Sequence, residues 1–169
     1  MKWQKIFLHK AFILSLCLIL VSGLAWYGIK TLQTRRAEHD AFIGDIENLY
    51  YFLKKEPFNM ETYAVLKEGD SVAISVWQNV ISTSEMNVKK YDLMINEHLH
   101  DYAHYKEIVV LKKLSEALEV FKEIRTENRE RVEGRPEYDI SDFQEQKDKL
   151  NSILGEVVNI AKEHNIDLR

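Results

Sequence analysis

One long uncharged stretch dominates this chain: nineteen residues, 11–29, lie between Lys10 and Lys30 without a single ionisable acid or base among them apart from one thiol and one phenol. At about 1.5 Å of rise per residue, a helix of this length matches the hydrocarbon core of a bilayer, which is roughly 30 Å thick. We therefore predict a single transmembrane helix here. Its first residue, its centre, its interfacial aromatic ring and its last residue are Ala11, Leu20, Trp26 and Ile29.

A cleaved signal peptide is the alternative interpretation of the same segment. Three lysines precede the apolar stretch: Lys2, Lys5 and Lys10. Small residues at Gly23 and Ala25 form a cleavage pattern, which would free the rest of the chain near Ala25. The apolar character continues past Ala25, and this favours an uncleaved signal-anchor over residues 1–30.

The orientation follows from the ends of the stretch. Basic residues are equally numerous on its two flanks, but the N-terminal tail is very short and basic, whereas a long domain follows the stretch. We predict a single-pass protein of the cell membrane whose N-terminus is cytoplasmic. Residues 31–169 would then lie outside the cytoplasm, in the periplasmic or extracellular space. Signal cleavage would instead release a secreted domain.

Residues 31–169 are long enough for one domain and are acidic, with 19 basic and 27 acidic side chains. This negative balance repels a phosphate backbone, so nucleic acid is not an expected partner. The one cysteine, Cys17, lies inside the apolar stretch, and this excludes a disulfide within the chain and thiolate chemistry in the domain.

Helical spacing of apolar residues, with two prolines and six glycines in the whole chain, predicts an all-α fold: one transmembrane helix followed by an extended bundle of three to five helices. Pro57 is expected to end the first soluble helix, and the Ser82 to Glu85 capping box to begin another. The predicted helices lie near 31–55, 60–68, 71–81, 83–133 and 141–164. Two alternatives stay open, since 71–81 also alternates like a strand and 83–133 is either continuous or broken near 96–101.

A histidine cluster is the first candidate site. Three of the six histidines lie between His98 and His104. His100 and His104 are four residues apart, so on a continuous helix they share a face and can hold a divalent metal together with Glu97. Such a metal is the one cofactor the sequence suggests, and solvent-exposed helix histidines are the simpler interpretation. Clustered imidazoles beside acidic residues also suggest a response to pH.

An apolar stripe further along the chain is the second candidate site. Its four residues recur at helical spacing and are expected either in the core or on a partner-binding face, as in coiled-coil pairing. They are Leu111, Leu114, Leu118 and Phe121.

No motif of a known enzyme class occurs in the sequence: it has no Gly-rich phosphate loop, no His-Glu-x-x-His and no Gly-x-Ser-x-Gly. We therefore predict a non-enzymatic, membrane-anchored helical interaction or accessory subunit. Its expected partners are lipid along residues 11–29 and either a membrane protein or a second copy. The alternative is an extracytoplasmic helical domain that senses a ligand, a metal or pH.

Overall fold

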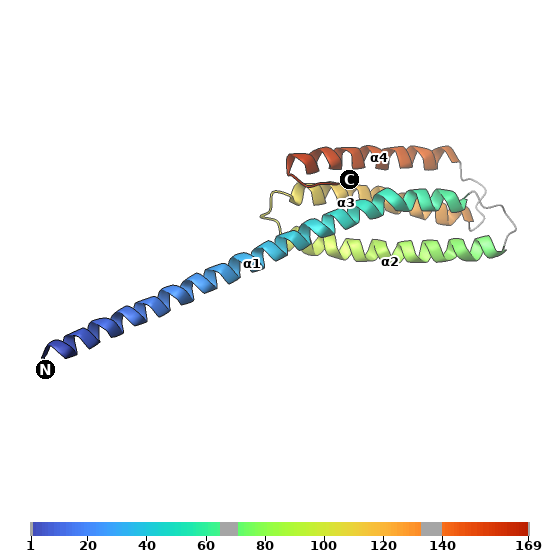
Figure 1. The fold of residues 1–169 in the computed structure, drawn as a ribbon. Helices are drawn as coiled ribbons and strands as arrows, with labels where there is room; N and C mark the ends of the chain where they lie inside the picture. The colour runs from blue at the N-terminus through green and yellow to red at the C-terminus, as the bar shows by residue number, and fades with distance from the viewer. Residues whose placement is uncertain (1, 65–70, 133–139, 169) are drawn as a thin grey trace. The chain divides into compact units, whose positions relative to one another are not determined.

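The computed structural model of the chain describes residues 2–64, 71–132 and 140–168, with side chains for 19–57, 79–126, 129 and 144–168. Within these residues the fold consists of four α-helices and no strand, which confirms the all-α prediction (Figure 1). The helices are α1 Lys2–Ala64, α2 Ser71–Asp101, α3 Ile108–Val132 and α4 Ile140–Glu163. The chain divides into two compact units, Met1–Phe42 and Ile43–Arg169.

Helix α1 is longer than the sequence pattern predicts. We expected Pro57 to end a helix near residue 55 and a separate helix over 60–68, but Pro57 lies inside α1, which continues to Ala64. A proline inside a helix loses one backbone hydrogen bond and costs about 3 kcal/mol. Its ring is buried here, so tertiary packing of the helix compensates for the poor local propensity.

Helix α2 is likewise continuous where a new start was predicted. It runs through Ser82 without interruption, so the capping box from Ser82 to Glu85 does not begin a helix. The helical interpretation of 71–81 is confirmed and the strand alternative is wrong. A capping box is favourable only where backbone N–H groups lack partners, and an upstream turn of helix already supplies those partners.

The predicted long helix over 83–133 is broken, as one of the two alternatives foresaw. Helix α2 ends at Asp101, and a turn over 102–107 leads into α3. Within the turn the Tyr105 N–H donates to the Tyr102 carbonyl and the Ile108 N–H donates to the Tyr105 carbonyl. The break therefore begins just after the 96–101 window and reverses the chain.

The second unit is an antiparallel helical bundle in which α3 packs against both α2 and α4 (Figure 1). Contacts between side chains give the register. On α1 and α2, Asp45 meets His98 while Phe52 meets Tyr91. The same reversed order joins α2 to α3 and α3 to α4, through the pairs Asp92–Lys122, Glu85–Arg125, Lys113–Glu156 and Glu123–Lys149.

The core of this bundle is aliphatic with an aromatic centre. The Phe52 ring of α1 lies 5.2 Å from the Phe121 ring of α3 and 4.9 Å from the Tyr91 ring of α2, measured between centroids. The edge-to-face arrangement of the two phenylalanines adds to the gain from area burial alone. Completely buried side chains on the bundle's helices include Ile46, Leu49, Leu53, Val110, Leu111, Leu114, Leu118, Phe121 and Ile124.

Helix α4 ends in a Schellman motif centred on Asn165. This residue has a φ of 59°, a left-handed conformation that asparagine tolerates better than most residues. The Ile166 N–H donates to the Ala161 carbonyl and the Asn165 N–H donates to the Lys162 carbonyl. The motif turns the chain so that Ile166 and Leu168 are buried, and this places the C-terminal residues on the bundle's own core.

In the first unit, the predicted transmembrane helix over 11–29 is only partly described. Residues 2–42 are helical, but the side chains of 11–18, which include Ala11, lie outside the described residues. Across the part that is described, no helix is both long and apolar enough to cross a bilayer. The other three span residues named from the sequence, Leu20, Trp26 and Ile29, are exposed side chains on α1.

Candidate functional site

The predicted partner-binding stripe lies in the core. The side chains of Leu111, Leu114, Leu118 and Phe121 are fully buried on α3. Their helical spacing is the pattern of a helix that packs along one face, and both α2 and α4 pack on α3. These four side chains therefore hold the bundle together and leave no exposed apolar face on this part of α3 for a partner.

The predicted metal site does not form. Among the residues that the structure describes, no group of three or more His, Cys, Asp or Glu side chains is placed to hold a metal ion. The reason is local: α2 ends at Asp101, so His100 is helical while His104 lies in the turn, and the shared helix face that four-residue spacing requires is lost. Both histidines and Glu97 are exposed, and the His100 Nδ1 lies 2.8 Å from the Asp101 carboxylate.

The structure instead singles out His98, which joins two helices. Its Nε2 lies 2.7 Å from Oδ2 of Asp45 on α1, and its side chain is mostly buried whereas that of Asp45 is partly exposed. The ion pair is complete when the imidazole is protonated, because only then does the ring carry a positive charge. This contact fastens the last turn of α2 to α1 across 53 residues of sequence.

A row of aromatic rings extends from His98 into the turn. The His98 ring packs edge-on against Tyr102 at 5.0 Å between centroids, and Tyr102 stacks on Tyr105 at 5.5 Å with the ring planes 9° apart. The His104 ring completes the row at 4.3 Å from Tyr105. Four rings thus form a continuous row of contacts from the last turn of α2 into the α2–α3 turn.

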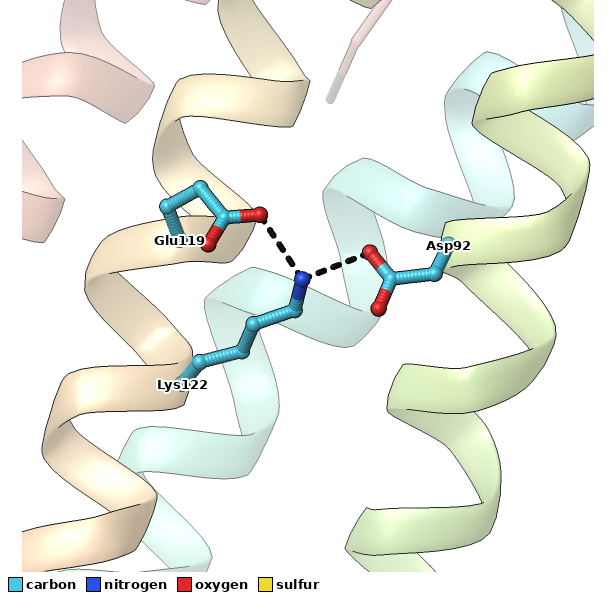
Figure 2. A network of polar contacts seen from close by, with 3 residues as sticks. All are labelled: Asp92, Glu119 and Lys122. Atoms are coloured by element: carbon cyan, nitrogen blue, oxygen red, sulfur yellow. Dashed lines mark hydrogen bonds and ion pairs between the residues drawn. The ribbon is translucent and has the colours of Figure 1, made fainter.

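Asp92, Glu119 and Lys122 make the clearest polar network between helices, shown in Figure 2. The Lys122 ammonium on α3 donates to Asp92 on α2 and to Glu119 one turn away, each at 2.7 Å. Burial lowers the pKa of Lys122, but the hydrogen bonds and charges of the two carboxylates outweigh burial and raise its pKa overall. The cation is therefore held firmly charged at neutral pH.

Further ion pairs tie α3 to its neighbours. Lys113 lies 2.7 Å from Glu116 and 2.8 Å from Glu156 of α4. The hydrogen bonds that Lys113 donates to these carboxylates raise its pKa. On α2, a hydrogen bond from Lys89, together with the positive charges of Lys89 and Arg125, lowers the pKa of Glu85. The pairs that join helices are Lys113–Glu156 and Glu85–Arg125, and because their carboxylates remain partly exposed, each pair contributes little to stability.

The first unit presents a different kind of surface. Eight large side chains between residues 19 and 32 are 53–73% exposed: Ile19, Leu20, Val21, Leu24, Trp26, Tyr27, Ile29 and Leu32. At about 100° per residue along a helix, these positions fall on every side of α1 rather than on one stripe. A helix that is apolar all round is suited to an apolar solvent such as lipid and not to one-sided packing on a protein.

Comparison with known proteins gives no relative: the chain matches no protein-family model, no curated protein and no solved structure.

Proposed function

We propose that this protein is a membrane-anchored helical subunit without catalytic activity of its own. The N-terminal part of α1 inserts into the bilayer over residues 11–29, and the bundle over 43–169 binds a protein partner outside the cytoplasm. The N-terminus is cytoplasmic in this proposal, and the anchor is retained rather than cleaved near Ala25.

The all-round exposure of apolar side chains on α1 is the single observation that carries the proposal. Six aliphatic residues are exposed there: Ile19, Leu20, Val21, Leu24, Ile29 and Leu32. Moving one such side chain out of water gains about 1.5–3 kcal/mol. Because the six side chains point in all directions, a surrounding apolar medium such as lipid buries all of them, whereas a single protein surface buries only those on one side.

Extraction of membranes with alkaline carbonate tests the anchor. The full-length protein should stay in the pellet, and a variant with Ile19→Lys and Leu20→Lys should move to the soluble fraction. Each lysine near the centre of a span costs about 2.5–3.5 kcal/mol of insertion. The matched control adds the same charges beyond the predicted span, through Gln33→Lys and Thr34→Lys, and should stay in the pellet. Release of the unaltered protein by carbonate would reject the anchor.

Labelling of one introduced thiol tests the orientation. Cys17→Ser removes the native thiol, and Ser152→Cys places a new one at an exposed position on α4. A membrane-impermeant maleimide should label this variant in intact cells. Labelling only after lysis would place the bundle in the cytoplasm, and a mass lacking residues 1–25 would indicate cleavage and secretion.

A pH-responsive bundle is the second candidate function, and the contact between His98 and Asp45 favours it. Protonation of an imidazole adds a positive charge 2.7 Å from a carboxylate that joins α1 to α2. A change in the strength of this contact would alter how firmly the last turn of α2 is held. The double-mutant cycle in the Discussion tests this candidate.

A further inference from the structure

Three basic residues follow the exposed apolar segment of α1. Lys30, Arg35 and Arg36 are all exposed, and no acidic residue precedes Glu38 in the chain. At about 100° per residue, the three basic positions lie roughly 100–140° apart around the helix, so together they encircle it. We call Lys30, Arg35 and Arg36 the basic ring.

The charges of the basic ring are not neutralised by the chain itself. Within the residues that the structure describes, none of the three side chains forms an ion pair. The nearest acids that follow on α1 are Glu38 and Asp40, and the Asp40 carboxylate lies 4.0 Å from Nδ1 of His39 instead. The ring is therefore available to anions from outside the chain.

The residues between the ring's members suit the boundary between lipid and water. The Thr31 hydroxyl donates to the Tyr27 carbonyl at 2.9 Å, and the Thr34 hydroxyl donates to the Lys30 carbonyl at 3.1 Å. Leu32 is 58% exposed. Since both hydroxyls already have partners on their own helix, this stretch carries little polar demand that only water can meet.

The positions of the charges along α1 separate the bases from the acids. A headgroup layer extends about 5–8 Å beyond the hydrocarbon core. Lys30 begins about 1.5 Å past Ile29, and Arg35 and Arg36 begin about 9–10 Å past it. Helical side chains lean toward the helix N-terminus, here toward the predicted span, so the long arginine side chains reach back into the layer. The two acids begin about 13 Å or more past Ile29 and are shorter, so they lie outside the layer.

This arrangement restricts what can bind the ring. A second copy lying parallel along this segment would place like charges against one another, which is unfavourable. A protein surface on one side of the helix would leave the charges on the other sides unpaired. Phosphate groups of surrounding lipids meet the charges on every side, and a guanidinium can bind a phosphate through two hydrogen bonds.

We propose that the basic ring binds the phosphate groups of anionic phospholipids in the leaflet at the C-terminal end of the predicted span. This inference rests on the proposed function, because the ring meets headgroups only where residues 11–29 cross the bilayer. Each basic residue beside an anionic surface favours association about fivefold. The lipid next to this end of α1 should therefore be enriched in anionic species.

Fluorescence quenching in vesicles tests the inference with the full-length protein. Trp26 is 73% exposed and lies four residues before Lys30 on the same side of the helix, so it reports on lipid near the ring. Trp3→Phe and Trp77→Phe leave it as the single tryptophan. The vesicles contain phosphatidylcholine with phosphatidylglycerol as the minor lipid, and either one or the other carries bromine atoms near the headgroup end of its acyl chains. Per molecule, brominated phosphatidylglycerol should quench Trp26 about threefold more effectively or better.

Removal of the three charges supplies the decisive comparison. Lys30→Gln with Arg35→Gln and Arg36→Gln should bring the two brominated lipids to equal effectiveness. The matched control removes three exposed lysines elsewhere, through Lys54→Gln, Lys55→Gln and Lys162→Gln, and should keep the preference. Salt that shortens the screening length to about 3 Å should weaken the preference of the unaltered ring. Circular dichroism of each variant checks that the helices are intact.

Four results would overturn the inference: equal quenching by the two lipids, a preference that survives loss of the ring's charges, an equal loss of preference in the control, or abolition of the preference by inorganic phosphate at constant ionic strength. The last result would identify a site for the free anion. Quenching without a headgroup preference rejects the basic ring alone, whereas the absence of quenching by either lipid rejects the anchor.

Discussion

Residues 19–32 of α1 and helix α3 are both rich in large apolar side chains, but they present them in opposite ways. On α3 the apolar residues are buried along one side, and Glu116, Glu119 and Glu123 are exposed on the other. On α1 the apolar side chains of residues 19–32 are exposed in every direction. The two segments therefore differ in how their apolar side chains are distributed around the helix.

The distribution of apolar side chains around a helix determines which surroundings can bury them. An apolar stripe on one side of a helix is buried by two or three neighbouring helices, while the charged side remains in water. An apolar surface on all sides needs a surrounding apolar medium. The two segments therefore differ in the surroundings that would bury their apolar side chains.

Two leucine-to-alanine substitutions test whether α3 buries its apolar side. One removes a buried side chain of α3 and the other removes an exposed side chain of α2. Leu114→Ala, in the centre of α3, should lower the free energy of unfolding by about 2–5 kcal/mol, because it removes buried atoms and leaves a cavity. Leu93→Ala, on the exposed side of α2, should change it by about 0.5 kcal/mol or less. Urea unfolding of the full-length protein in mild detergent, followed by circular dichroism, measures both.

Equal effects of the two substitutions would mean that α3 is not the buried centre of the bundle. A large loss for Leu93→Ala alone would show that the side of α2 that carries Leu93 is covered within the isolated protein. Either outcome would contradict the register deduced from the contacts between helices.

The sequence predicts the helices of the bundle better than their ends. The stripe from Leu111 to Phe121 has the spacing of a packed helix, and the structure buries it. The ends at Pro57 and Ser82 were predicted from local preferences of about 1–3 kcal/mol, and packing along a whole helix can exceed these preferences. Local signals of this size position a helix end only where no tertiary contact opposes them.

A substitution at Lys122 tests whether the charged residues of α3, as well as its apolar residues, join it to neighbouring helices. Lys122→Gln should lower the free energy of unfolding by about 1 kcal/mol near neutral pH, since it leaves Asp92 and Glu119 without their shared cation. Lys149→Gln is the matched control. It also removes a lysine that bridges two helices, but its 3.8 Å contact with Glu123 is more exposed, so a smaller loss is expected.

The effect of Lys122→Gln should depend on alkaline pH. The pKa of Lys122 is raised in the folded protein, so the folded state holds this proton more tightly than the unfolded chain does. The stabilisation is therefore complete below the ordinary lysine pKa of about 10.5 and is lost as pH rises through the raised value. Unfolding curves at pH 8 and above pH 11 should show the gap between the two proteins closing. A gap independent of pH would contradict an electrostatic origin.

The histidines near the end of α2 show which sequence signals predict a contact and which do not. His100 and His104 have metal-ligand spacing, but that spacing is useful only on an unbroken helix, and α2 ends between them. His98 follows the buried Tyr91 and Ile95 at steps of four and three, which is the spacing of an inward-facing residue. This signal was present in the sequence. Its partner Asp45 is 53 residues away and could not be identified before the helices were placed.

The contact between His98 and Asp45 gives the smallest expected effect and the most specific one. A double-mutant cycle with His98→Gln and Asp45→Asn should yield a coupling energy of about 0.5–1 kcal/mol, because Asp45 is still partly exposed. The coupling should be larger with a charged imidazole than with a neutral one, since only the protonated ring attracts the carboxylate by charge. The pair His100 and Asp101 is the control: its 2.8 Å separation is similar, but both side chains are exposed and adjacent in sequence, so its coupling should be close to zero. If the His98 cycle gives the same coupling in acid and in alkaline solution, the contact is a structural hydrogen bond and the pH-responsive candidate fails. If the His100–Asp101 cycle gives an equal coupling, the His98–Asp45 contact is no stronger than the attraction between two exposed residues adjacent in sequence.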